Sequence, residues 1–260
     1  MSERERPAPP LLLRSTLPIV LALLYLPLVA MVIASFADQG APSFRWYVEV
    51  AGDENLWNAL FRSVAVAAGS SLVSAILGVL GALALDKWGF RARPALRMLS
   101  GLSLMLPELV LALALLGWFA MFGVPLSLWT VIAAHVTLTL PFVILIVGAR
   151  LKALDPAYDD AARDLGARES QVFFRVTLPL LGPSVLTSFV LAFLISFDDF
   201  LVTFYTTGSG SDTLPVRLYT MMKTGMSPKV QALSSIMLVG SVAMIFLLVR
   251  LRAIRDLTAS

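Results

Sequence analysis

Cysteine is absent from the 260-residue chain, which excludes disulfides, thiolate-bound metals and a cysteine nucleophile. Histidine occurs once, as His135, so we expect no metal site. Charged residues are also scarce: they make up 14% of the chain, against about 25% in a soluble domain. No Gly-x-x-x-x-Gly-Lys-Ser/Thr loop is present to hold nucleotide phosphates. We therefore expect a protein that is not an enzyme, binds no cofactor and cannot hydrolyse ATP alone.

Apolar residues fill most of the chain, at 58% of all residues with a mean hydropathy of +0.84. They gather in runs long enough to cross a membrane, for which about 20 apolar residues suffice. We predict an all-α membrane protein forming a single domain over 1–260, with its core at about 57–250. The six predicted transmembrane helices cover 17–36, 61–85, 98–120, 128–148, 180–202 and 233–249.

The first run also has features of a signal peptide, because arginines precede it and Ser35-Phe36-Ala37 loosely resembles a cleavage site. A signal peptide usually has an apolar region of only about 7–15 residues, and this run is longer. The sequence therefore favours an uncleaved membrane anchor.

Basic residues lie in short clusters between the runs, which indicates membrane topology and not nucleic-acid binding, because cytoplasmic segments retain an excess of Lys and Arg. A cytoplasmic N-terminus places 15 of the 20 basic residues on the inner side. Both termini are then cytoplasmic, which agrees with six spans. The inner residues are Arg4, Arg6, Arg14, Lys87, Arg91, Arg93, Arg97, Arg150, Lys152, Arg163, Arg168, Arg175, Arg250, Arg252 and Arg255.

The longest predicted cytoplasmic connector, at about 150–179, is amphiphilic and looks folded. Asp155-Pro156 is typical of a helix start, because Asp caps free N–H groups and Pro suits the first turn. Gly166 interrupts the helical pattern. We predict two short helices with a bend between them.

The same connector carries a spaced motif. Asp160-Ala161-Ala162 is followed after three residues by Gly166 and later by Leu178-Pro179. This resembles the EAA loop of binding-protein-dependent ABC permeases, in which Glu-Ala-Ala, Gly, Ile and Leu-Pro have the same spacing. Asp160 stands where Glu is usual, and Val176 replaces Ile. The resemblance implies that this loop couples the chain to a partner ATPase.

The resemblance extends along nearly the whole chain and is greatest to PotC-type permeases of spermidine/putrescine importers. It rests on 106–108 and 134–135, on Leu140-Pro141-Phe142 and on Ser196-Phe197-Asp198-Asp199. It implies a type I ABC importer permease fold in a bacterial inner membrane. The implied partners are a second, PotB-like permease, an ATPase dimer that holds ATP-Mg, and an extracytoplasmic substrate-binding protein.

Acidic residues within the runs are candidates for the substrate pathway, because ionised groups in a span usually face a bundle interior or a water-filled cavity. Fixed carboxylates suit a cationic polyamine, and aromatic rings suit its methylenes. The alternative for these residues is local hydrogen bonding, and for His135 we favour a bond to a neighbouring helix over a role in the pathway. Gly69, Gly78 and Gly81 predict a small face for close helix packing. The pathway candidates are Glu108, Asp198, Asp199, Trp118, Phe197 and Tyr205.

Three alternatives stay open at this point. The same class of transporter is compatible with another cargo, such as a small organic cation, an amino-acid derivative, thiamine or ferric ion. A secondary carrier or channel would work without ATP and would make the EAA-like segment dispensable. An intramembrane enzyme would depend on Glu108 or the aspartate pair for its chemistry.

Overall fold

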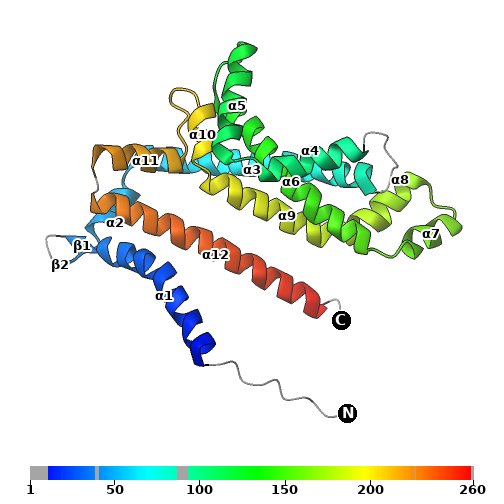
Figure 1. Ribbon diagram of the computed structural model, residues 1–260, viewed down its shortest axis with the longest axis horizontal. Helices are drawn as coiled ribbons and strands as arrows, with labels where there is room; N and C mark the ends of the chain where they lie inside the picture. Colours follow the sequence, from blue (N-terminus) through cyan, green and yellow to red (C-terminus); the bar gives the residue numbers. More distant parts are fainter. Residues whose placement is uncertain (1–10, 39–40, 87–92, 226, 259–260) are drawn as a thin grey trace. The chain divides into compact units, whose positions relative to one another are not determined.

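The computed structural model describes residues 11–38, 41–86, 93–225 and 227–258, and these are mainly helical (Figure 1). The basic residues Arg4, Arg6, Lys87 and Arg91, used above for topology, lie outside the described residues. The chain divides into two units, each described here by itself. One consists of residues 1–53 and 220–240, and the other of residues 54–219 and 241–260.

The smaller unit contains α1 (Leu11–Ala34), a short β-ribbon and α2 (Arg45–Ala51). The ribbon joins β1 (Ala37–Asp38) to β2 (Ala41–Pro42) in antiparallel register, with Ala37 opposite Pro42. Phe36 stacks on Tyr47 at a ring distance of 4.9 Å, and the Tyr47 hydroxyl lies 2.6 Å from that of buried Ser35. These contacts join the end of α1 to α2.

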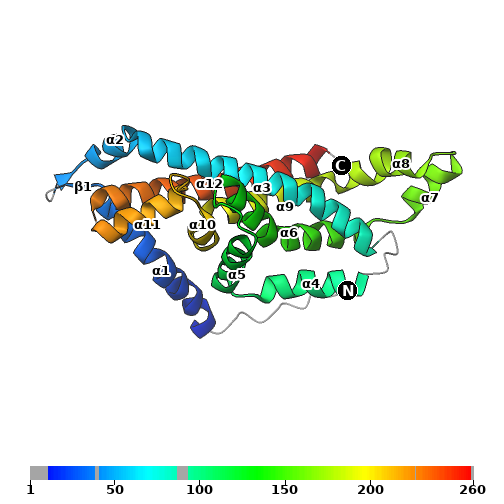
Figure 2. The same ribbon diagram turned by 90° about the horizontal axis from the view of Figure 1, so that it is seen from above.

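The larger unit is built around three long helices: α3 (Glu54–Asp86), α6 (Leu128–Ala153) and α9 (Leu178–Asp198). They lie side by side, as Figures 1 and 2 show, and their shared core is apolar. α4 (Arg93–Met105), α5 (Glu108–Met121) and α10 (Leu201–Thr206) pack around them, and α11 (Leu214–Thr224) follows α10. The buried core residues are Val79, Ala82, Leu83, Val143, Val147, Leu181 and Ala192.

The predicted small face of α3 is confirmed as a packing surface. A Cβ atom at Gly78 would overlap the side chain of Val143, and one at Gly81 would lie 3.1 Å from Ile144 Cδ1. Ser74 on the same face lies 2.8 Å from Thr139 of α6 through their hydroxyl oxygens. Small residues therefore let α3 and α6 approach closely.

Four helical stretches of the described chain are long and apolar enough to cross a membrane: Glu54–Asp86, Leu128–Ala153, Glu169–Asp198 and Pro228–Phe246. Pro18–Ala34 and Glu108–Met121 are shorter apolar helices. The last of the four belongs to α12 (Pro228–Thr258). Both the number of six spans and the cytoplasmic termini stay predictions.

Two predicted helices were wrong in their continuity. The run 98–120 is divided at Leu106 and Pro107 into α4 and α5. Proline has no N–H to donate and disfavours a helical residue before it, so the helix stops there. The run 180–202 is likewise interrupted, at Asp199 and Phe200 between α9 and α10.

The connector at 150–179 contains the predicted bend but not two separate short helices. α7 (Ala157–Asp164) ends before Gly166, and α8 (Glu169–Val172) begins after it. A π-helical turn, Phe173–Thr177, then joins α8 to α9. The second helix is therefore the start of one continuous helix, Glu169–Asp198.

Candidate functional site

The interruption between α9 and α10 brings polar groups into the apolar bundle. Asp199 leaves the helix with ψ near 130°, and its side chain turns back to the first turn of α10. Its carboxylate accepts the N–H groups of Val202 and Thr203 at 3.3 and 2.8 Å. It also accepts the Thr203 hydroxyl at 3.0 Å. Because its side chain is only 1% exposed, Asp199 stabilises the start of α10 from inside the protein.

His135 of α6 is completely buried beside this carboxylate. Its Nε2 lies 3.1 Å from Asp199 Oδ2 and 2.9 Å from Thr203 Oγ1. Its Nδ1 lies 2.6 Å from the Ser196 hydroxyl oxygen, which in turn accepts the Ser70 hydroxyl of α3 at 3.0 Å. The prediction that His135 bonds to neighbouring helices is therefore confirmed.

The other two acidic candidates are more accessible. Asp198 ends α9, is exposed, and accepts the Ser241 hydroxyl with its two carboxylate oxygens at 3.1 and 3.2 Å. Glu108 is the exposed first residue of α5, and its carboxyl lies within hydrogen-bonding reach of Asp199. The structure therefore gathers the carboxyl groups of Glu108 and Asp199 at one place and puts Asp198 next to them in the chain.

The aromatic candidates are spread more widely. Trp118 lies ten residues after Glu108 on α5, about 15 Å along the helix, and contacts Phe122 at 4.9 Å between ring centroids. Phe197 precedes Asp198 and stacks on Phe193 at 5.9 Å. Tyr205 of α10 packs against the core between α5, α6 and α10. The structure does not bring Trp118 to the carboxyl groups, and the role of all six residues in a pathway stays a prediction.

The EAA-like residues lie on the helix–turn–helix segment that the sequence indicated. Asp160, Ala161 and Ala162 are on α7, Leu178 and Pro179 are the first residues of α9, and Gly166 forms the turn with φ of +82°. L-amino acids with a side chain rarely adopt this φ, whereas glycine does so readily. The turn therefore depends on Gly166 for its backbone conformation.

Arg163 forms ion pairs with carboxylates on both sides of this turn. Its guanidinium donates to Glu169 of α8 at 2.7 and 3.3 Å and to Asp160 at 2.9 Å. The carboxylates of Glu169 and Asp160 raise the pKa of Arg163 above its already high value, so its charge is retained at any physiological pH. All three side chains are exposed, so solvent and salt reach these ion pairs.

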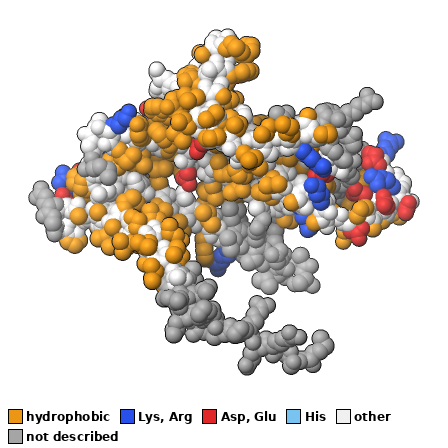
Figure 3. All heavy atoms as spheres, viewed as in Figure 1, with side chains coloured by type: hydrophobic (Ala, Val, Ile, Leu, Met, Phe, Trp, Pro, Cys, Tyr) orange, Lys and Arg blue, Asp and Glu red, His pale blue; other side chains and the backbone are white. Residues whose placement is uncertain are grey.

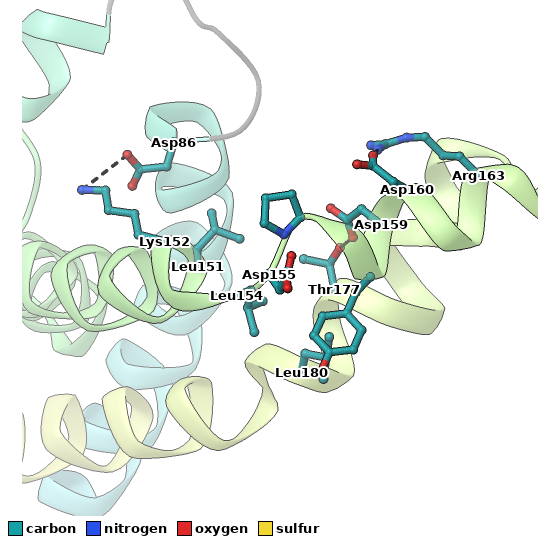
Figure 4. Close-up of a pocket in the computed structure, with 12 residues that line it drawn as sticks. Asp86, Leu151, Lys152, Leu154, Asp155, Asp159, Asp160, Arg163, Thr177 and Leu180 are labelled. Carbon is teal, nitrogen blue, oxygen red and sulfur yellow. Dashed lines mark hydrogen bonds and ion pairs between the residues drawn. The ribbon is translucent and has the colours of Figure 1, made fainter.

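An open cavity of about 290 Å³ lies at the base of this segment (Figure 4). Its lining includes Asp86 at the end of α3 and Lys152 at the end of α6, which form an ion pair at 3.5 Å. Asp159 of α7 accepts the Thr177 hydroxyl at 3.0 Å on another side of the cavity. The Asp159–Thr177 bond connects α7 to the π-helical turn that leads into α9, and the ion pair connects α3 to α6.

The surface of this unit differs between its middle and its α7–α8 end. Figure 3 shows mostly hydrophobic side chains over its middle and charged side chains gathered around α7 and α8. Large apolar residues are nevertheless exposed among these charges: Leu165 is 90% exposed and Tyr158 is 56% exposed.

Sequence reasoning missed the polar partners of the acidic residues. Ser70, Ser196 and Thr203 surround His135 and Asp199, and Ser241 binds Asp198. The available signal was small hydroxyl residues inside apolar runs. That signal is weak, because many such hydroxyls bond only to their own helix, as Ser188 does with the carbonyl of Val185.

The bundle of apolar helices contains buried polar groups around His135 and Asp199, and it carries the exposed, charged α7–α8 segment at one end. This is the architecture of a membrane transport subunit. The family model described as "Binding-protein-dependent transport system inner membrane component" matches residues 74–257, and the chain belongs to this family.

Curated relatives agree with this assignment. The chain is 35% identical over 233 residues to the spermidine/putrescine transport system permease protein PotC of Escherichia coli (strain K12), covering 87% of this chain and 88% of that protein. It is 32% identical over 232 residues to the putrescine transport system permease protein PotI of the same strain, covering 83% and 81%.

A solved structure shares the fold. The chain resembles one from a bacterial ABC transporter involved in the import of the acidic polysaccharide alginate, with a TM-score of 0.72 and 17% identity over 94% of both chains. At this level of identity, the likeness concerns the fold alone.

Proposed function

We propose that this chain is a membrane-spanning permease of an ATP-driven importer that carries polyamines, such as spermidine or putrescine, across a bacterial inner membrane. The observation that carries the proposal is its similarity over 87% of its length to the PotC permease of a spermidine/putrescine system. Six spans, cytoplasmic termini and pairing with a second, PotB-like permease belong to the same proposal.

The exposed α7–α8 segment supports a coupling role. Ala161 presents a small side chain to solvent, and the exposed Leu165 and Tyr158 offer apolar contact area. A partner ATPase with bound ATP-Mg would dock on this surface and supply the hydrolysis. The bond between Asp159 and Thr177 then links a displaced α7 to the π-helical turn that leads into α9.

The acidic residues support a cationic cargo. Moving an ammonium group from water into the bundle costs free energy, which nearby carboxylates offset. Asp198 and Glu108 are exposed and acidic, so they are the residues we assign to the polyamine pathway. Asp199 belongs to the same acidic group, although its carboxylate is occupied by donors from the protein.

The direct test reconstitutes the permease in lipid discs with the ATPase, second permease and binding protein encoded beside it. ATP hydrolysis is compared with empty, putrescine-loaded and spermidine-loaded binding protein. We expect stimulation by a loaded protein. Hydrolysis that ignores both polyamines would mean another cargo, and failure of any ATPase to associate would overturn the permease role.

A pair of variants locates the coupling in the same experiment. Gly166→Pro removes the N–H that donates to the Arg163 carbonyl at 2.8 Å and cannot adopt φ of +82°. We expect it to abolish stimulation while the chain still inserts into the membrane. Gly166→Ala keeps the N–H and meets nothing within 4 Å of its Cβ, but it strains the left-handed backbone, so it should lower the stimulation less than Gly166→Pro does. Full stimulation in the proline variant would contradict coupling at this turn.

A further inference from the structure

The α9–α10 break is bridged by a single side chain from another helix. His135 contacts Ser196 on α9 with one ring nitrogen and Asp199 and Thr203, beyond the end of α9, with the other. The imidazole therefore spans the point where the backbone leaves the helix. Every one of these groups is buried, so water does not replace the bonds.

With His135 neutral, the hydrogen atoms in this cluster have a consistent arrangement. The Asp199 carboxylate accepts, so Nε2 carries the hydrogen, and Nδ1 accepts the Ser196 hydroxyl. The Ser70 hydroxyl then donates to Ser196 Oγ, and Thr203 donates to Asp199. In this arrangement the hydrogen bonds run from Ser70 through Ser196 and His135 to Asp199. The Asp199 carboxylate is therefore held in one orientation.

The orientation of Asp199 determines where its neighbour lies. Asp198 is the last residue of α9, and the backbone leaves the helix at Asp199, so fixing the buried Asp199 carboxylate also fixes the end of α9 that carries Asp198. In the described chain, the Asp198 carboxylate accepts one side-chain hydroxyl, that of Ser241. One exposed hydrogen bond contributes little to holding this carboxylate in place.

We infer that His135 is a positioning residue, which clamps the α9–α10 break and thereby places the Asp198 carboxylate for passage of a cationic substrate. The inference rests on the proposed function for its transport readout. Its structural readout does not, because the position of residue 198 is measurable without any cargo.

Two substitutions of His135 test its contacts with Asp199 and with Ser196 separately. His135→Gln puts an amide near the place of Nε2 and keeps a donor for Asp199, whereas His135→Asn keeps a polar group only near Nδ1 and Ser196. Thr139→Val is the matched control, since it removes the buried bonds of Thr139 to Ser74 of α3 and to the carbonyl of His135 but leaves the bonds of the His135 ring in place. Asp199→Asn removes the charge that accepts the Nε2 hydrogen, the same side of the clamp, and replaces His135→Asn if that variant does not fold.

The first measurement uses the absence of cysteine from the chain. Asp198→Cys is labelled with a cationic methanethiosulfonate reagent in lipid discs, in each background. We expect His135→Asn to change the labelling rate about tenfold, as loss of a hydrogen bond to a charged group implies. His135→Gln and Thr139→Val should leave the rate unchanged. Equal rates in all backgrounds, or an equal change in the Thr139 control, would overturn the inference.

The second measurement is polyamine transported per ATP hydrolysed by the reconstituted complex. His135→Asn should lower this ratio about tenfold without lowering ATP hydrolysis, and adding it to Asp198→Asn should cause no further loss, because both changes act through one carboxylate. Additive losses would overturn the inference. If the unchanged complex transports neither polyamine, the proposed cargo is wrong, and the labelling rates still decide the role of His135.

Discussion

The chain interrupts its helices at two places that are held by opposite kinds of contact. The α9–α10 break is buried. His135 of α6 and Thr203 of α10 bond to Asp199 there, and Ser70 of α3 bonds to Ser196. The α7–α8 turn is exposed and depends on the backbone of Gly166 and on ion pairs of Arg163. The α9–α10 break, or inner break, therefore needs specific hydrogen-bond partners, because water cannot replace them. The α7–α8 turn, or outer turn, needs a residue whose backbone tolerates positive φ.

The largest effect is expected at the inner break. Asp199→Ala removes the acceptor for four donors and leaves His135 buried without its carboxylate, which costs about 3–5 kcal/mol of unfolding free energy. The adjacent, exposed Asp198→Ala should cost less than about 1 kcal/mol. Unfolding of the permease in mixed micelles measures both changes. Similar losses at the two aspartates would show that burial does not distinguish them.

A smaller effect is expected at the outer turn. Gly166→Ala should cost about 1–2 kcal/mol, because a residue with a Cβ is forced into the left-handed region. Space is not the cause, since nothing lies within 4 Å of the added atom. Gly182→Ala, within α9 and equally unobstructed, should instead gain about 0.5–1 kcal/mol. The same unfolding assay would contradict the backbone argument if both variants lost stability equally.

The smallest effect concerns the ion pairs across the turn. Glu169→Gln should lower the thermal midpoint by no more than about 2 °C, because exposed ion pairs contribute little. The difference from the unchanged protein should shrink between about 0.01 M and about 1 M salt, as screening increases. Thr139→Val provides the buried counterpart, and its loss of stability should not depend on salt. A salt-independent effect of Glu169→Gln would mean that the pair is shielded.

Much of the fold followed from hydrophobic runs alone. The runs at 61–85 and 128–148 lie inside α3 and α6, and Gly78 marked the surface where these two helices meet. Hydropathy averages over many residues, so it did not separate α4 from α5 at Pro107, although the proline itself carried the signal. The π-helical turn that makes α8 continuous with α9 left no comparable signal.

The site was harder to predict because its roles come from distant parts of the chain. Asp198 and Asp199 are identical neighbours, and sequence reasoning treated them as a pair. Asp199 is buried because His135 of α6 reaches it, and Asp198 is exposed. That distinction depends on a contact across 64 residues, which periodicity and local motifs do not contain.

The continuity of α8 with α9 also has a mechanical consequence. One helix runs from Glu169, which Arg163 holds beside the Gly166 turn, to Asp198 at the inner break. Its 30 residues form a lever about 45 Å long. A tilt of about 5° at the Glu169 end would move the far end sideways by about 4 Å, more than the length of a hydrogen bond. A carboxylate at the tip of such a lever would change its surroundings through a movement that leaves every bond within the helix intact.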